Sequence, residues 1–91
     1  MSNFRRQVWF SGHVQGVGFR YKTVQVASGY DVAGLVKNLD DGRVYLCAVG
    51  DEREVKEFTE QLQSVMRDFI RQSDVRDDVC DFKYKGFKIE L

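Results

Sequence analysis

Three glycines and an arginine lie where a short strand is expected to give way to a helix, in the run Gly12-His13-Val14-Gln15-Gly16-Val17-Gly18-Phe19-Arg20. Because glycine has no Cβ atom, it adopts backbone angles that turn successive amide N–H groups toward one point, and such a concavity binds anions. The free N–H groups at the start of the following helix add positive potential. The guanidinium of Arg20 matches two oxygens of a phosphate group. The pattern is typical of a site for a doubly charged oxyanion.

Two well-known phosphate loops do not match this run. The P-loop pattern requires a lysine directly after its last glycine, and none follows here. The dinucleotide-binding fingerprint requires a third glycine after Gly16 and Gly18, where the chain has Tyr21. On the pattern alone, a structural glycine-rich turn with Arg20 at the surface is equally compatible with the sequence.

Length and charge narrow the classes of protein that the chain can represent. Its 91 residues suffice for one domain, residues 1–91, and its 14 Lys and Arg balance 14 Asp and Glu. This balance argues against a strongly basic nucleic-acid-binding chain. The longest apolar run, residues 44–49, is far too short to span a bilayer, and the N-terminus has no signal-peptide pattern. We therefore expect a cytoplasmic protein that does not engage a membrane.

The elements around the glycine-rich run follow from periodicity and turn residues. Alternation predicts a strand over residues 7–11, with Val8 and Phe10 on one face and Trp9 on the other. A short helix is expected over residues 21–28. The turn Asp40-Asp41-Gly42 predicts a hairpin between two further strands. Those strands are expected over residues 32–39 and 43–49.

The second half predicts one longer helix and a closing strand. Asp51 is suited to cap a helix, and apolar residues recur at spacings of three and four as far as Ile70, with no Gly or Pro to end it sooner. Alternation over residues 82–91, interrupted by Gly86, predicts the closing strand. With a further strand between about residues 69 and 84, the order is βαββαβ.

The glycine-rich run resembles the signature loop of the acylphosphatase family. The segments Gly34-Leu35-Val36-Lys37-Asn38 and Asp41-Gly42-x-Val44 resemble that family's second signature. The resemblance implies a ferredoxin-like α+β sandwich, with two helices on one face of an antiparallel sheet. It also implies a monomeric enzyme that hydrolyses the carboxyl-phosphate bond of acyl phosphates without metal or cofactor. Inorganic phosphate would be both its product and an inhibitor.

The resemblance also assigns roles to individual residues. Arg20 matches the arginine that binds the phosphoryl group, and Asn38 matches the asparagine that positions the attacking water. The glycines Gly12, Gly16 and Gly42 match residues that shape the loops. The backbone amides expected to hold the phosphate are those of Gln15, Gly16, Val17, Gly18, Phe19 and Arg20.

The remaining reactive residues have structural interpretations. Cys47 and Cys80 match no metal-ligand spacing and are expected to be buried thiols of a reducing compartment. His13 is expected at the surface, outside the chemistry. A rival function is single-stranded RNA binding, because the same element order builds RNA-recognition domains and Gly16-Val17-Gly18-Phe19 resembles part of their core motif. Against this rival, Val17 replaces an aromatic residue, and the motif falls in a loop.

Overall fold

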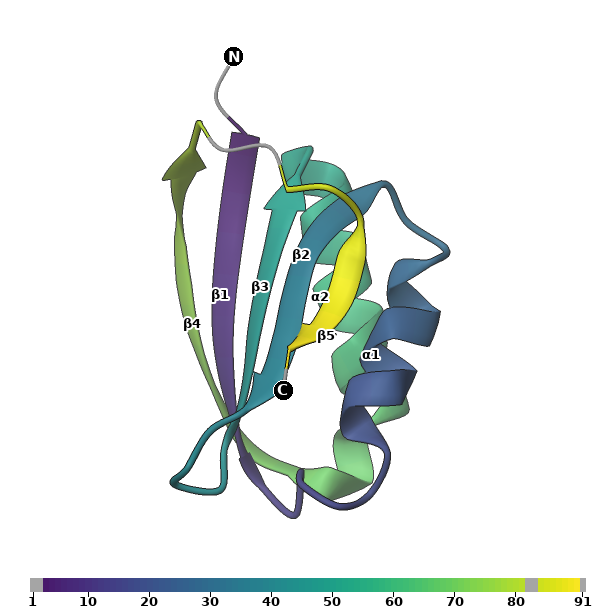
Figure 1. The fold of residues 1–91 in the computed structure, drawn as a ribbon, viewed down its shortest axis with the longest axis vertical. Helices are drawn as coiled ribbons and strands as arrows, with labels where there is room; N and C mark the ends of the chain where they lie inside the picture. Colours follow the sequence, from purple (N-terminus) through teal and green to yellow (C-terminus); the bar gives the residue numbers. More distant parts are fainter. Residues whose placement is uncertain (1–2, 82–83, 91) are drawn as a thin grey trace.

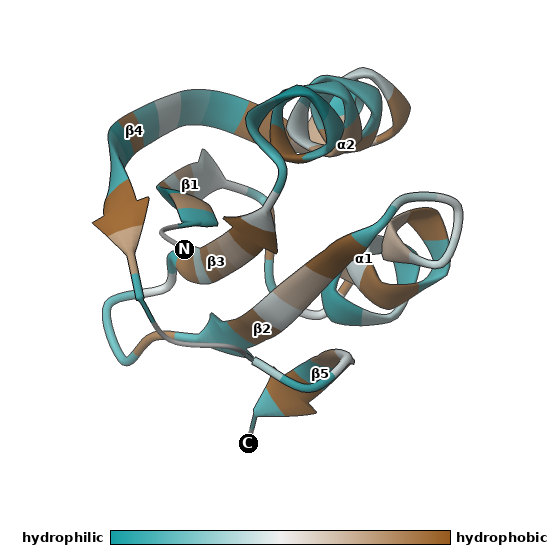
Figure 2. Ribbon diagram, turned by 90° about the horizontal axis from the view of Figure 1, so that it is seen from above, coloured by the Kyte–Doolittle hydropathy of each residue, from teal (hydrophilic) through white to brown (hydrophobic). Residues whose placement is uncertain are grey.

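The chain forms a single sheet with two α-helices on one of its faces (Figures 1 and 2). The structure is a computed structural model that describes residues 3–81 and 84–90. Its elements are, in chain order, β1 (Asn3–Gly12), α1 (Phe19–Ala27), β2 (Val32–Asn38), β3 (Val44–Gly50), α2 (Glu52–Val65), the 3₁₀ turn η1 (Arg67–Phe69), β4 (Ile70–Cys80) and β5 (Phe87–Glu90). The α+β sandwich expected from the resemblance is confirmed, and β5 is one strand more than the predicted βαββαβ order contains.

The strands lie in the order β4-β1-β3-β2-β5. Every neighbouring pair is antiparallel except β2 and β5, which run parallel. The expectation of a wholly antiparallel sheet is therefore wrong at this edge. β4 and β5 lie at opposite edges of the sheet, and β5 runs in the same direction as β2 (Figure 1).

The core lies between the sheet and the helices. Val8 and Phe10 of β1 are fully buried there, as their alternation with Trp9 predicts. Trp9 lies on the open face of the sheet, where its ring centroid is 5.2 Å from that of Tyr45. Core side chains also come from β2, β3 and both helices, including Phe19, Ala27, Val36, Val44, Leu46, Ala48, Val55, Phe58 and Leu62.

The second helix is shorter than its periodicity predicts. The helix α2 ends at Val65, and η1 separates it from β4, which begins at Ile70. Val65 and Phe69 are exposed, so the apolar spacing does not continue into the core at these positions. Ile70 instead pairs with Gly12 as the first residue of β4. Pairing with β1 thus overrides local periodicity, because a longer helix would carry Ile70 away from the sheet.

Three other boundaries also differ from the sequence predictions. β1 is longer than expected because both of its edges are paired, one with β3 and one with β4. The helix α1 begins at Phe19, two residues early, because Gly18 ends the loop in a left-handed conformation and Phe19 is buried. The closing strand is confined to β5, and Tyr84 precedes it. Residues 82, 83 and 91 of the predicted closing strand lie outside the described residues.

Within the described part of the chain, neither α1 nor α2 has the length and apolarity needed to cross a membrane.

Candidate functional site

The glycine-rich loop and the β2–β3 hairpin lie at the same end of the molecule, at the bottom of Figure 1. The sheet register brings them together. Near the end of β1, Phe10 pairs with Val44 of β3, and Val44 pairs in turn with Asn38 of β2. Two residues after Phe10, the chain leaves β1 at Gly12 and enters the loop. Asn38 and the loop are therefore neighbours in space although they are distant in sequence.

The loop turns through two left-handed glycines. Gly16 and Gly18 both have φ 78°, a conformation that costs other residues roughly 1–2 kcal/mol. No atom would lie within 4 Å of a Cβ added at either position, so backbone conformation rather than space requires glycine there. Gly18 is also the N-cap of α1, and no side chain caps the helix. The first-turn N–H groups of α1 therefore have no side-chain acceptor at the cap.

The side chain of Gln15 joins the loop to the hairpin. Its Nε2 donates to the carbonyl oxygens of Leu39 at 2.8 Å and Arg43 at 3.0 Å. Leu39 and Arg43 flank the turn of the hairpin, and the Leu39 N–H also donates to the Arg43 carbonyl at 2.8 Å. The family resemblance assigns only the backbone amide of Gln15 to the site. The role of its side chain was missed, since no spacing rule links a loop glutamine to a hairpin carbonyl.

Arg20 lies in the first turn of α1, and Asn38 is the last residue of β2. Asn38 lies two residues after the buried Val36, so it points to the helix-covered face of the sheet. Arg20 is half-buried in the first turn of α1, and α1 packs against β2. The first turn has no acidic residue, and the described residues place no carboxylate in an ion pair with Arg20. This end of α1 is therefore electrostatically suited to an anion.

The hairpin turn is held by its own ion pair. Asp41 Oδ2 lies 2.8 Å from Arg43 Nε, and Asp41 Oδ1 accepts from the Arg43 backbone N–H at 3.1 Å. Hydrogen bonds and charge from Arg43 lower the pKa of Asp41. Gly42 occupies the turn with φ 93°. Because Arg43 pairs with Asp41 and the turn also contains Asp40, residues 40–43 carry no net positive charge.

The family model for acylphosphatase matches residues 6–89 of the chain. The chain belongs to the acylphosphatase family. It is 50% identical over 58 residues to an acylphosphatase of Archaeoglobus fulgidus, a match that spans 64% of this chain and 65% of that protein. It is 40% identical over 78 residues to an acylphosphatase of Vibrio parahaemolyticus, which covers 86% of this chain and 87% of that protein.

A solved acylphosphatase structure, from Bacillus subtilis, has the same fold. It superposes with a TM-score of 0.86 at 30% identity and covers 97% of this chain and 99% of that one. The comparisons give the RNA-binding interpretation no support. In the structure, the segment Gly16-Val17-Gly18 lies in the loop before α1 and not on a strand.

The other candidate residues of this acylphosphatase-family chain have the surroundings that the sequence predicts. His13 is exposed, and Cys47 and Cys80 are buried. Burial raises the pKa of the Cys47 thiol, which disfavours the thiolate. Cys47 and Cys80 lie on β3 and β4 with β1 between them, so their Cα atoms are at least about 9 Å apart, beyond disulfide reach. In residues 3–81 and 84–90, no three His, Cys, Asp or Glu side chains could hold a metal ion together.

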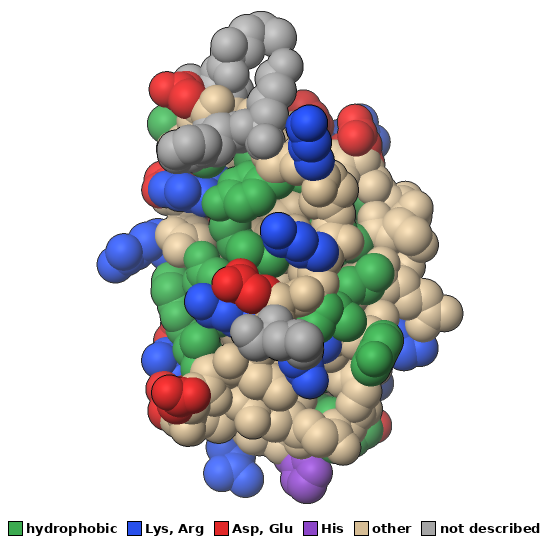
Figure 3. Space-filling view, viewed as in Figure 1, with side chains coloured by type: hydrophobic (Ala, Val, Ile, Leu, Met, Phe, Trp, Pro, Cys, Tyr) green, Lys and Arg blue, Asp and Glu red, His purple; other side chains and the backbone are tan. Residues whose placement is uncertain are grey.

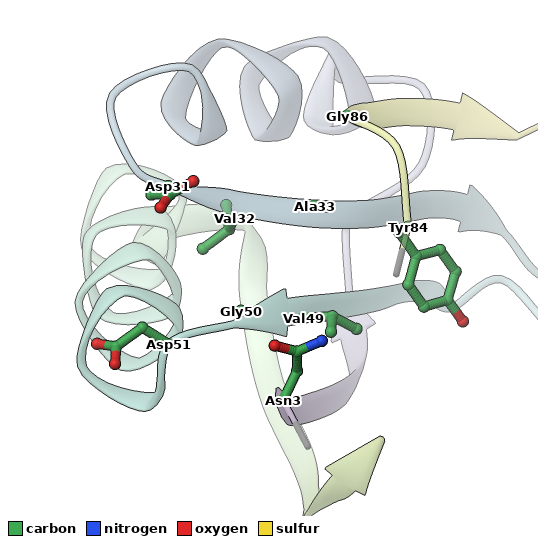
Figure 4. Close-up of a pocket in the computed structure, with 9 residues that line it drawn as sticks. All are labelled: Asn3, Asp31, Val32, Ala33, Val49, Gly50, Asp51, Tyr84 and Gly86. Carbon is green, nitrogen blue, oxygen red and sulfur yellow. The ribbon is translucent and has the colours of Figure 1, made fainter. Parts of the chain in front are cut away.

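Two depressions of the surface are lined by neither Arg20 nor Asn38. One, of about 590 Å³, lies at the opposite end of the sheet and is lined in part by Asn3, Asp31 and Tyr84 (Figure 4). None of the predicted site residues lines it. The other, of about 250 Å³, borders the start of the glycine-rich loop at Gly12 and His13. The sequence gives no signal for this second cleft, because its other wall comes from the distant segment 68–71.

Proposed function

We propose that residues 1–91 form a single acylphosphatase-like domain that hydrolyses acyl phosphates to a carboxylate and inorganic phosphate. The main support is one arrangement: a loop with left-handed glycines runs into an uncapped helix that carries Arg20, and Gln15 ties that loop to the hairpin bearing Asn38. The family membership of the chain supports the same reaction.

In this proposal the phosphoryl group is held before any bond changes. The backbone amides of residues 15–20 surround its oxygens, and Arg20 supplies a permanent positive charge. Phosphoryl transfer passes through a loose transition state with charge on the three equatorial oxygens. Donors fixed in advance stabilise that charge without reorganising during the reaction. The left-handed glycines keep these donors in place.

Asn38 positions the attacking water. Its amide does not titrate, so it acts by geometry: its oxygen accepts a hydrogen bond from the water while its nitrogen can donate elsewhere. A bond forms between the water oxygen and phosphorus as the bond from phosphorus to the acyl oxygen breaks. The electron pair of the broken bond leaves on the carboxylate, and the proton of the water ends on the phosphate or in solvent.

No general acid is required at the leaving group. The conjugate acid of a carboxylate has a pKa near that of Glu, about 4.3, so the group departs without a proton at neutral pH. The exposed His13 therefore needs no part in the reaction. We further propose that the activity needs no metal and no cofactor, because fixed donors and a guanidinium can provide the charge stabilisation.

We also propose a cytoplasmic monomer whose substrate is a small molecule and which binds neither nucleic acid nor membrane. The buried thiols of Cys47 and Cys80 suit a reducing compartment.

The test is hydrolysis of acetyl phosphate in the presence of a chelator, with wild type and the Asn38→Ala variant. Wild type should be active, and the variant should lose roughly 10²–10³-fold in kcat, the scale for one positioned group. Inhibition by inorganic phosphate should persist in the variant, which shows that its phosphate site is intact. Wild-type kcat in the folded variant would remove Asn38 from the mechanism, and chelator-sensitive activity would refute metal independence.

A further inference from the structure

The cleft at the start of the glycine-rich loop is lined by side chains that have no role in the proposed mechanism. It encloses about 250 Å³ and is lined by Gly12, His13, Asp68, Phe69, Ile70 and Arg71. It therefore matches a small organic substituent in size.

The cleft is built on a close contact. Gly12 pairs with Ile70 across a register shift in the β1–β4 ladder. A Cβ added to Gly12 would lie 2.6 Å from the Phe69 carbonyl oxygen and 2.7 Å from the Arg71 nitrogen, which is too close for any other residue without movement. The start of the glycine-rich loop therefore contacts the junction between η1 and β4 directly.

Within the sheet, the cleft and Asn38 lie on opposite sides of β3. In the strand order β4-β1-β3-β2-β5, the cleft is at the junction of β4 and β1, and Asn38 is on β2, beyond β3. In phosphoryl transfer, the attacking and leaving oxygens are roughly in line through phosphorus. A water held by Asn38 therefore directs the leaving acyl group away from β2, toward β4 and the cleft.

We propose that this cleft receives the acyl group of the substrate, and that Arg71 favours acyl phosphates whose acyl group carries a second carboxylate. The inference rests on the proposed function, because the in-line direction is set by Asn38. Arg71 is a specificity residue in this proposal, and it takes no part in the bond changes.

The chemistry of the cleft determines this substrate class. Arg71 is exposed, and no ion pair engages it among the described residues. Its planar guanidinium can donate two hydrogen bonds to a carboxylate. Phe69, 37% exposed, offers an apolar surface for the rest of the acyl group. Asp68 balances the charge of Arg71, so recognition depends on the guanidinium geometry more than on net charge.

The experiment compares two substrates that differ by a single group, benzoyl phosphate and 4-carboxybenzoyl phosphate. For each protein, kcat/KM is measured with both, and the ratio of the two values reports on the added carboxylate. Arg71→Ala is the test variant. Arg67→Ala is the matched control, because Arg67 is also exposed and lies four residues earlier, but lines a different depression.

We expect Arg71→Ala to lower the ratio of 4-carboxybenzoyl to benzoyl phosphate by roughly tenfold or more, the scale of one charge-assisted hydrogen bond. Arg67→Ala should leave the ratio unchanged. A ratio that is the same in Arg71→Ala and wild type, or that falls equally in both variants, overturns the inference while the proposed function stands. If wild type hydrolyses neither substrate, the proposed function itself fails, and this inference fails with it.

Discussion

The proposed role of Arg20 depends on the residue at which α1 begins. Gly18 ends the loop in a left-handed conformation, and Phe19 anchors the first turn in the core. Arg20 then follows in a turn without acidic neighbours. A guanidinium at this point contributes both charge and a planar pair of donors. A lysine would supply the charge alone.

We predict that Arg20→Ala weakens inhibition by inorganic phosphate by roughly 10–100-fold, the range for a charged hydrogen-bonding partner, and also lowers kcat. Arg20→Lys should recover only part of the loss, because lysine restores the positive charge but not the planar pair of hydrogen-bond donors. Steady-state kinetics with phosphate as inhibitor measures both effects.

The control for this prediction is Lys22→Ala, which removes a positive charge two residues later on the same helix. It should change the inhibition constant far less than Arg20→Ala does. Equal effects from the two variants would mean that the general field of α1 binds the anion, and that Arg20 has no specific contact.

At the scale of elements, the glycine-rich loop and the β2–β3 hairpin are joined by the Gln15 side chain. The hairpin already closes on itself through the Asp41–Arg43 pair. Gln15 adds the connection between two segments that meet only in the folded state. In the proposed mechanism, this connection sets the distance between the loop amides that hold the phosphate and Asn38. Its loss should therefore affect the chemical step more than substrate binding.

We predict that Gln15→Met, which keeps length but removes both donors, lowers kcat while KM changes little. The free energy of unfolding should fall by roughly 1–2 kcal/mol, for two part-buried hydrogen bonds. Urea unfolding and steady-state kinetics measure the two effects. Gln25→Met, at an exposed position on α1, is the matched control. A raised KM with unchanged kcat would contradict a positioning role.

At the scale of the whole molecule, two arginines of β1 hold the edge strand β4. Arg5 pairs with Asp78 at 2.6 Å, and Arg6 pairs with Asp77 at 2.8 Å. Arg6 Nη1 also donates to Thr59 Oγ1 of α2 at 2.9 Å, so this residue connects both layers. The hydrogen bonds from Arg6 lower the pKa of Asp77, and those from Arg5 lower the pKa of Asp78.

The lowered pKa of Asp77 predicts how stability depends on pH. A carboxyl group whose pKa falls on folding stabilises the protein above its unfolded value, near 3.8, and loses that contribution as the pH drops through the folded value. Asp77→Asn should therefore lower the free energy of unfolding at neutral pH by roughly 1 kcal/mol or less, the range for an exposed pair.

Denaturant unfolding from pH 7 down to pH 2 checks this prediction. The difference between wild type and Asp77→Asn should shrink once the pH falls below about 4. Asp74→Asn is the control on the same strand, since Asp74 accepts a hydrogen bond from the neutral Gln72 side chain and, among the described residues, forms no ion pair. A difference that stays constant with pH would show that the Arg6–Asp77 pair does not contribute through its charge.

Most of the fold could be predicted from local patterns. The faces of β1 and β3, the hairpin at Gly42 and the start of α2 follow from alternation, turn residues and the Asp51 cap. These features depend on neighbours in sequence, and local sequence therefore predicts them. The predictions failed where a distant partner intervened. The end of α2 is one case, since Ile70 must pair with β1. The direction of β5 is another, since β5 pairs in parallel with β2, a strand distant from it in sequence.

The sequence by itself determined the chemical groups of the proposed site: the glycines that bend the loop, the arginine after them and the asparagine at the end of β2. Only the tertiary structure decided how these groups are joined, through Gln15 to the hairpin and through Gly12 to the η1–β4 junction. The physical reason is that residue type and spacing act along the chain, whereas hydrogen bonds and close contacts between separate segments exist only once the sheet register is fixed.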